Sequence, residues 1–172
     1  PVLDDGYADS AAELVGDHSI TGGLRGSKYS AFEGGTRIPA VISWPGRITQ
    51  PSVSGALISQ IDLFRSLASI IGAELPEDAA PDSHDLSEVL LGADTTGRDW
   101  IVEWSYTLSV RTREWKYIAP NDYPKSLSWC PGIETGTEPV PQLYRLPDEH
   151  TNVAPQHPDT VAELQKLLEE IF

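Results

Sequence analysis

The sequence predicts an α/β protein in which the end of a doubly wound sheet precedes a small antiparallel sheet packed against a C-terminal helix. Three observations support this fold class. A run rich in β-branched residues at 38–44 is followed by apolar residues at helical spacing up to residue 72. Beyond residues 92–99 the apolar pattern alternates, as in antiparallel strands. Residues 158–171 then carry one apolar helical face, which must pack on a sheet.

Turn residues and apolar spacing define the elements of the first half. Residues 38–44 predict a strand that ends in the turn Pro45-Gly46. A helix opens next at Ser59 or Gln60 and stops at Gly72. We predict that its apolar stripe is core, formed by Ile61, Phe64, Leu67, Ala68 and Ile71. A loop over 74–83 and a short helix over 86–91 follow.

Short alternating segments predict the strands of the second half: residues 100–104, 108–113, 115–118 and 142–146. Residues 121–141 hold four prolines and two glycines and show no clean period, so we predict a long loop that can border a pocket. Pro158 suits the first position of the last helix. Its apolar face comprises Val161, Leu164, Leu167, Leu168 and Ile171.

Composition limits the possible classes of function. The 172 residues are 40% hydrophobic, enough for the core of one ordinary domain. A formal net charge of −14 argues against nucleic acid or an anionic membrane as general partners. No apolar run reaches the length of a membrane span. The sequence has no methionine and opens on Pro1 in what resembles a turn, so we interpret it as a fragment or a processed chain.

The glycine-rich segment 21–39 lies in a stretch that carries a net positive charge, although the chain as a whole is acidic. Four Lys or Arg residues stand against one acid between residues 25 and 47, a local +3 in an acidic chain. Such a reversal indicates an anion site or an internal salt bridge, and the glycines allow close approach of the backbone to a ligand. We expect Arg37 to pair with Glu33, because a buried arginine is usually paired. Lys28 is the better candidate to meet an anion.

This segment closely resembles the second signature of the sulfatase family, in which an arginine, small residues and a lysine precede Glu-Gly-Gly and Arg-x-Pro. Ser27 stands where glycine is commoner. The likeness extends over nearly the whole chain and is strongest at 22–39 and 141–154. The fixed positions of the signature are occupied by Arg25, Lys28, Glu33, Gly34, Gly35, Arg37 and Pro39.

The resemblance implies an alkaline-phosphatase-like fold and the hydrolysis of sulfate esters of a sugar or an aryl group. Sulfatases use a formylglycine, made from Cys or Ser and held by a calcium ion, to attack sulfur. A lysine of this signature binds the sulfate oxygens. That catalytic role falls on Lys28, and we expect Arg25 and His18 to bind substrate. For His18, a structural or solvent-facing role is the alternative to donating a hydrogen bond to an anion.

The resemblance also divides the chain. It implies that residues 1–95 form the C-terminal end of a sulfatase catalytic domain and residues 96–172 a small C-terminal domain. The nucleophile and the calcium ligands would lie upstream of Pro1, so the fragment alone is expected to be inactive. Asp4 and Asp5 are then solvated turn residues. Cys130 cannot be the nucleophile, because Pro131 follows it directly, and is best interpreted as a small apolar residue in a loop.

Three functions stay open at this point. The first is the C-terminal part of a sulfatase, with a sulfated small molecule or glycan and the missing N-terminal part as its partners, in the periplasm or secreted. The second is a phosphatase or phosphodiesterase relative, because a lysine in a glycine-rich loop does not distinguish sulfate from phosphate. The third is a non-catalytic binding or structural module. Trp129 could stack on a sugar ring or anchor its loop.

Overall fold

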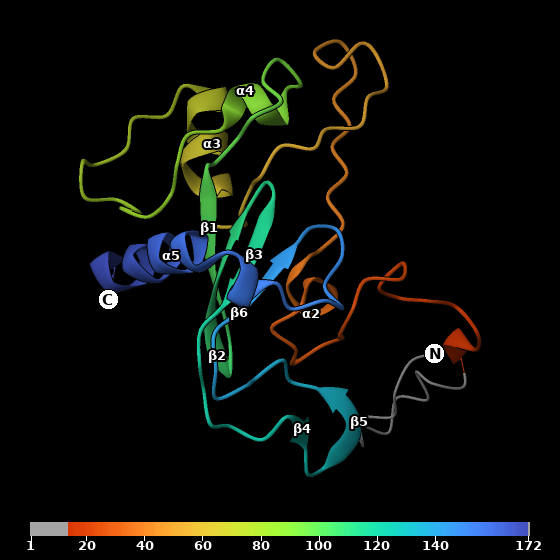
Figure 1. The fold of residues 1–172 in the computed structure, drawn as a ribbon. Coiled ribbons are helices and arrows are strands. Elements are labelled where there is room, and N and C mark those ends of the chain that lie inside the picture. The colour runs from red at the N-terminus through yellow and green to blue at the C-terminus, as the bar shows by residue number, and fades with distance from the viewer. Residues whose placement is uncertain (1–13, 172) are drawn as a thin grey trace. The chain divides into compact units, whose positions relative to one another are not determined.

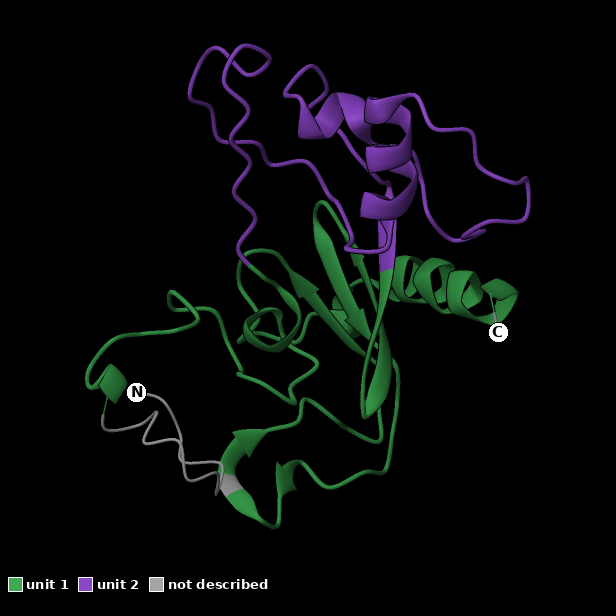
Figure 2. Ribbon diagram, turned by 180° about the vertical axis from the view of Figure 1, so that it is seen from behind, with its two compact units in different colours: residues 1–38, 102–172 green, residues 39–101 purple. Residues whose placement is uncertain are grey.

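The computed structural model describes residues 14–171 and divides the chain into two compact units. One unit combines residues 1–38 with residues 102–172, and the other comprises residues 39–101 (Figure 2). The glycine-rich signature therefore groups with the C-terminal part of the chain. The division into domains at residues 95 and 96 stays a prediction, and Asp4 and Asp5 lie outside the described residues.

A four-stranded sheet is the framework of the first unit (Figure 1). β3 pairs antiparallel with both β2 and β6, and Lys116 of β3 lies opposite Arg111 and Tyr144. The strands stand close to their predicted places, and consecutive residues of β3 and β6 are buried, so both faces of the sheet are covered there. In sheet order they are β1 (Trp100–Ser105), β2 (Thr107–Thr112), β3 (Trp115–Ile118) and β6 (Gln142–Arg145).

The C-terminal helix α5 (Pro158–Ile171) begins at Pro158, as predicted. It follows the short 3-10 helix η1 (Ala154–Gln156) and contacts β2 and β3. Leu164 and Leu168 are the residues of its apolar face that become buried. The prediction that this face packs on the antiparallel sheet is confirmed.

Residues 121–141 are not the uninterrupted loop that the sequence predicts. Within them β4 (Ser126–Leu127) and β5 (Cys130–Glu134) form a small antiparallel pair. Strands this short leave no alternating pattern, and the proline and glycine of β5 disfavour a strand by propensity. Packing overrides propensity here, because Leu127, Cys130 and Ile133 form a buried cluster.

The second unit contains α3 (Asp62–Ile71) and α4 (Ser87–Leu90), which contact each other. Gly72 ends α3 in the left-handed conformation, with φ of 69°, as expected for a C-terminal glycine. Residues 38–44 form no strand, contrary to the prediction. A strand needs a hydrogen-bonded neighbour, and among the described residues this segment has none.

The two faces of α3 also differ from expectation. Phe64, Leu67 and Ile71 were predicted to be core, yet each is more than half exposed. Ile61 is 50% exposed as well. The buried face carries Asp62, Ser66 and Ala68, so of the predicted stripe only Ala68 is buried. Buried polar side chains therefore hold this helix in its unit, and the apolar face of Phe64, Leu67 and Ile71 is exposed.

Asp62 and Arg98 are the centre of a buried polar network. Arg98 Nε donates to Asp62 Oδ2 at 2.8 Å, and both side chains are almost completely buried. The backbone amides of Ser59 and His84 each donate to the same carboxylate at 2.9 Å. Burial alone would raise the pKa of Asp62, but the hydrogen bonds from Arg98 and the amides outweigh it and hold the pKa below its ordinary value.

No helix among residues 14–171 is long and apolar enough to cross a membrane.

Replacing Arg98 tests the network. Arg98→Leu should lower the free energy of unfolding by about 3–5 kcal/mol, because it leaves the Asp62 carboxylate buried without its cation. Lys166→Ala is the control, since Lys166 forms an exposed pair with Glu170 and should change stability by less than about 0.5 kcal/mol. Urea unfolding measures both variants. Equal stability of the two would contradict a stabilising role for the Asp62–Arg98 pair.

Candidate functional site

Lys28 lies at the tip of a tight turn. The amide of Ser30 donates to the carbonyl of Ser27 at 2.9 Å, which leaves Lys28 and Tyr29 as the two central residues. Tyr29 has φ of 75°, a left-handed conformation that turns usually give to glycine or asparagine. The Lys28 side chain is exposed, and its ammonium lies 4.8 Å from the centroid of the Tyr29 ring. The turn thus presents a cation at the surface.

Tyr29 is held in this conformation by packing. Its ring meets Trp129 edge to face, with 5.2 Å between the centroids. It also packs against the buried cluster of Leu127, Cys130 and Ile133 on the β4–β5 pair. Such a backbone persists only where its surroundings hold it, and it is commoner at functional sites than elsewhere.

The two glycines of Glu-Gly-Gly allow the short helix α2 (Glu33–Thr36) to approach the Lys28 turn. The amide of Gly34 donates to the carbonyl of Arg25 at 2.8 Å. A Cβ atom on Gly35 would lie 2.2 Å from the carbonyl oxygen of Ser30 and 2.5 Å from that of Ser27. A side chain cannot fit there without displacing the backbone of the turn. The signature glycines are therefore explained by close backbone contact.

Arg25 is engaged inside the protein. Its Nε donates to Glu134 Oε2 at 3.0 Å, and a second bond joins Nη2 to Glu134 Oε1. Nη1 donates to the carbonyl of Glu149. The guanidinium also lies over Phe32, with Cζ 3.8 Å from the ring centroid. These contacts fix the start of the signature, whereas binding of substrate by Arg25 stays a prediction.

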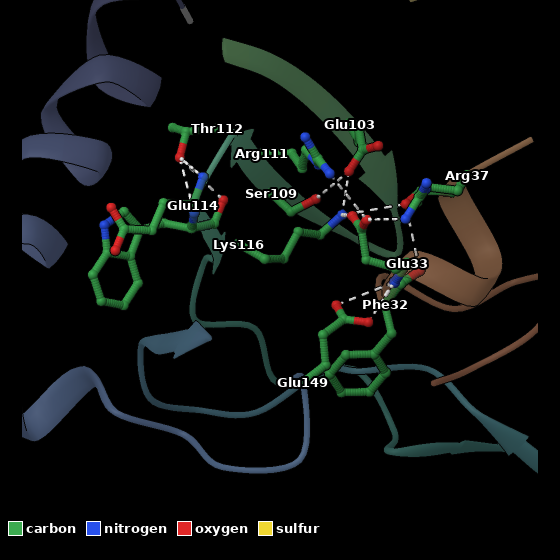
Figure 3. A network of polar contacts seen from close by, with 12 residues as sticks. Phe32, Glu33, Arg37, Glu103, Ser109, Arg111, Thr112, Glu114, Lys116 and Glu149 are labelled. Atoms are coloured by element: carbon green, nitrogen blue, oxygen red, sulfur yellow. Dashed lines mark hydrogen bonds and ion pairs between the residues drawn. The ribbon is translucent and has the colours of Figure 1, made fainter. Parts of the chain in front are cut away.

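Glu33 is the buried centre of the signature (Figure 3). Its side chain is 2% exposed, and Oε2 lies 3.5 Å from both Arg37 Nη1 and Arg111 Nη2. Lys116 Nζ lies 3.8 Å from Oε1. The predicted pair of Glu33 and Arg37 is confirmed, but two further cations from β2 and β3 share the carboxylate.

Lys116 is completely buried and extends from β3 toward this carboxylate (Figure 3). It forms an ion pair with Glu103 Oε2 and a hydrogen bond of 3.2 Å to Thr36 Oγ1. A buried ammonium is stable only where carboxylates and hydrogen-bond acceptors surround it. Lys116 therefore joins the sheet to α2.

Glu149 completes the set from the turn that follows β6. Both of its carboxylate oxygens accept from the backbone amide of Glu33, at 2.9 and 3.1 Å. Burial raises the pKa of Glu149 to about 7, although the Glu33 amide, Lys116 and Arg25 oppose the rise. We name the six charged residues Glu33, Arg37, Glu103, Arg111, Lys116 and Glu149 the carboxylate network.

Sequence analysis found Glu33 and Arg37 but missed the rest of the carboxylate network. The alternation of β3 offered a signal for Lys116, because it shares a face with the buried Ile118. Glu149 lies in a polar turn, where no periodic pattern of apolar residues could indicate that it is buried. Its role depends on a contact between residues 116 positions apart in the chain.

His18 lies on an exposed turn, where its backbone amide donates to the carbonyl of Val15 at 3.2 Å. The structure thus draws Arg25 into internal contacts and leaves Lys28 and His18 exposed. The roles predicted for Lys28, His18 and Arg25 toward a substrate stay predictions.

Within residues 14–171, no group of three or more His, Cys, Asp or Glu side chains is placed to hold a metal ion. Cys130 is buried in the β4–β5 cluster. Sequence analysis overlooked that Ser43 to Arg47 has the spacing Ser-x-Pro-x-Arg. These residues form a turn in which Arg47 lies over Trp44, 5.5 Å from its ring centroid. The family resemblance places the nucleophile before the signature, and Ser43 follows it.

Gly35→Ala should destabilise the unit that contains the signature by about 1–3 kcal/mol, since the added methyl group overlaps two carbonyl oxygens of the Lys28 turn. Gly55→Ala is a matched control, because no atom would lie within 4 Å of its Cβ. Thermal unfolding compares the variants. If both variants unfold like the original protein, close contact does not explain the glycine.

Titration of Glu149 should make stability depend on pH. A pKa of about 7 in the folded protein and about 4.5 in the unfolded chain means that the folded state retains this proton to higher pH. Raising the pH from 4.5 to 7 therefore removes stability, by about 1–3 kcal/mol.

Glu149→Gln should remove most of this loss, because the amide has no proton to release and its oxygen can still accept from Glu33. Chemical unfolding at a series of pH values measures the difference between the two proteins. Glu163→Gln, at an exposed position of α5, should leave the pH dependence unchanged. Parallel pH profiles for the original protein and Glu149→Gln would exclude Glu149 as the source.

Comparison with known proteins matches this chain to sulfatases. The family model described as Sulfatase matches residues 13–73, which include the signature. N-acetylgalactosamine-6-O-sulfatase of Bacteroides thetaiotaomicron is 48% identical over 176 residues, covering 99% of this chain and 34% of that protein. Arylsulfatase G of Canis lupus familiaris is 31% identical, covering 75% of this chain and 25% of that protein. The chain thus spans about a third or less of the length of these relatives.

A solved structure shows the same fold. It is described under "Metabolism of multiple glycosaminoglycans by bacteroides thetaiotaomicron", and superposes with a TM-score of 0.91 at 48% identity. The match covers 99% of this chain and 36% of the other. The predicted fold class, a partial alkaline-phosphatase-like α/β fold, is confirmed by this neighbour. On its signature, its relatives and its fold, the chain belongs to the sulfatase family.

Proposed function

We propose that the complete protein hydrolyses sulfate esters of glycans and that Lys28 binds the sulfate group. One observation carries the assignment of Lys28. Lys28 occupies the lysine position of the signature and is exposed at the tip of a turn that the Ser30 amide closes on the Ser27 carbonyl. The signature therefore presents an ammonium group at the surface.

An ammonium group suits this task. It is a compact point charge on a flexible stem, which can approach a tetrahedral oxyanion from the side that the turn leaves open. Its contribution to rate comes from the negative charge that grows on the sulfate oxygens as the ester bond breaks. The strained Tyr29 backbone and the two glycines keep the turn in one conformation, so this charge is positioned before substrate arrives.

The relatives support a sulfated sugar as substrate, because the most similar curated protein named above acts, by its name, on N-acetylgalactosamine 6-O-sulfate. Calcium and formylglycine would supply the nucleophile in a sulfatase. The family resemblance places the nucleophile and the calcium ligands before the signature, so we assign both to the remainder of the protein. Lys28 is limited to holding the sulfate and its developing charge.

We also propose that the exposed stripe of α3 packs against that remainder. Phe64, Leu67 and Ile71 form one apolar face at helical spacing, and soluble proteins rarely expose such a face without a partner. The chain accounts for only 34% of the length of the relative to which it is 48% identical, so most of the protein is available to cover it.

Lys28→Ala in the complete protein should lower kcat/KM for N-acetylgalactosamine 6-sulfate by about 100- to 1000-fold, through loss of a preorganised charge. Lys125→Ala is the control, because Lys125 is an exposed lysine paired with Glu138 and should retain activity. Ser43→Ala should also retain activity, since the nucleophile is assigned elsewhere. Steady-state assays with a sulfate ester and the matching phosphate ester measure all three variants.

The outcomes separate the alternatives. Faster hydrolysis of the phosphate ester would favour a phosphatase relative, and no hydrolysis of either ester would favour a binding module. Activity of residues 1–172 alone, dependent on Lys28, would show that the nucleophile lies in this chain. Loss of that activity in Ser43→Ala would then identify Ser43.

A further inference from the structure

A group of aromatic side chains, several of them exposed, includes Tyr29 of the Lys28 turn. Trp104 and Tyr106 lie with their ring centroids 6.3 Å apart, and Tyr106 stacks on Tyr123 at 4.3 Å and 15°. Tyr29 and Trp129 form a second, edge-to-face pair. We name the five residues Tyr29, Trp104, Tyr106, Tyr123 and Trp129 the aromatic platform.

The two pairs of the aromatic platform share one base. Tyr29 and Tyr106 both pack against the buried cluster of Leu127, Cys130 and Ile133. They are partly buried and anchor the β4–β5 pair to the Lys28 turn and to the segment between β1 and β2. These contacts join segments from three regions of the chain into one surface within a single compact unit.

The outer members of the platform are too exposed to be core. Trp104 is 72% exposed, Trp129 51% and Tyr123 42%. Large aromatic side chains held at the surface in a group mark a binding site more often than single exposed ones do. Anchoring of the loop, the alternative role for Trp129, accounts for its edge contact with Tyr29 but leaves half of its surface open.

We propose that the aromatic platform binds a sugar ring of the sulfated glycan while Lys28 binds its sulfate group. This inference rests on the proposed function and adds the site that recognises the carbohydrate. A pyranose ring has one face of C–H groups, which a flat indole or phenol covers, and its hydroxyls can bond to the polar tips of Trp and Tyr.

Charge favours a sulfated sugar over an apolar protein segment as the occupant. The Lys28 ammonium lies 4.8 Å from the Tyr29 ring, so a cation borders the platform directly. In a chain with a net charge of −14, such a cation beside aromatic rings matches a ligand that combines an anionic group with a C–H face. The three most exposed members, Trp104, Trp129 and Tyr123, also carry an indole N–H or a phenol hydroxyl that can form hydrogen bonds.

Binding of three probes to the complete protein tests the proposal: N-acetylgalactosamine 6-sulfate, its desulfated form and inorganic sulfate. Trp129→Ala and Trp104→Ala should each weaken binding of both sugars about tenfold or more, because the C–H face loses its apolar contact. Binding of inorganic sulfate should not change. Trp129→Phe should retain most of the affinity, since a flat ring remains.

Trp44→Ala is the control for loss of an exposed tryptophan, as Trp44 belongs to the other unit and lies against Arg47. Isothermal titration calorimetry gives the affinities, and circular dichroism confirms that each variant is folded. Unchanged sugar affinity in folded Trp129→Ala and Trp104→Ala would overturn the aromatic platform, as would failure of the original protein to bind either sugar.

Failure of the proposed function would look different. If the platform variants lose affinity but the original protein binds sulfated and desulfated sugar equally, the result supports the aromatic platform and contradicts a sulfate site at Lys28. If Lys28→Ala loses only the preference for the sulfated sugar, both proposals are supported.

Discussion

The buried carboxylate of Glu33 is the interaction on which the signature depends. Three cations, from the residue that follows α2, from β2 and from β3, lie within 3.8 Å of its oxygens, while its backbone amide donates to Glu149. An isolated charge in this position would cost several kcal/mol, so the cations are required once the acid is present. The short helix α2 is too small to be stable by itself. The charges fix it to the sheet, and the glycines fix the Lys28 turn to it.

This arrangement separates two uses of positive charge. Lys116 and Arg111 neutralise buried carboxylates inside the fold. Arg25, at the start of the signature, forms an ion pair with Glu134. Lys28 belongs to the same segment and is exposed. The carboxylate network contains three cations and three carboxylates, so its charges are matched within the fold.

Much of this could be predicted from the sequence, for identifiable reasons. Alternation revealed β1, β2, β3 and β6, and Pro158 and Gly72 marked a helix start and a helix end, because these signals are local. The pair of Glu33 and Arg37 was also local, four residues apart. The β4–β5 pair, the Asp62–Arg98 pair and Glu149 were not predictable, since each depends on contacts between distant segments. The expected strand at 38–44 failed for the same reason, because a strand is defined by its neighbour.

The link between Glu149 and the Glu33 amide has a consequence for the order of folding. Residues 25–37 precede the groups that hold them, which belong to residues 103–149. These contacts can form only after the later residues have been synthesised, and contacts between distant segments form slowly. The conformation of the signature therefore depends on completion of the sheet that follows it.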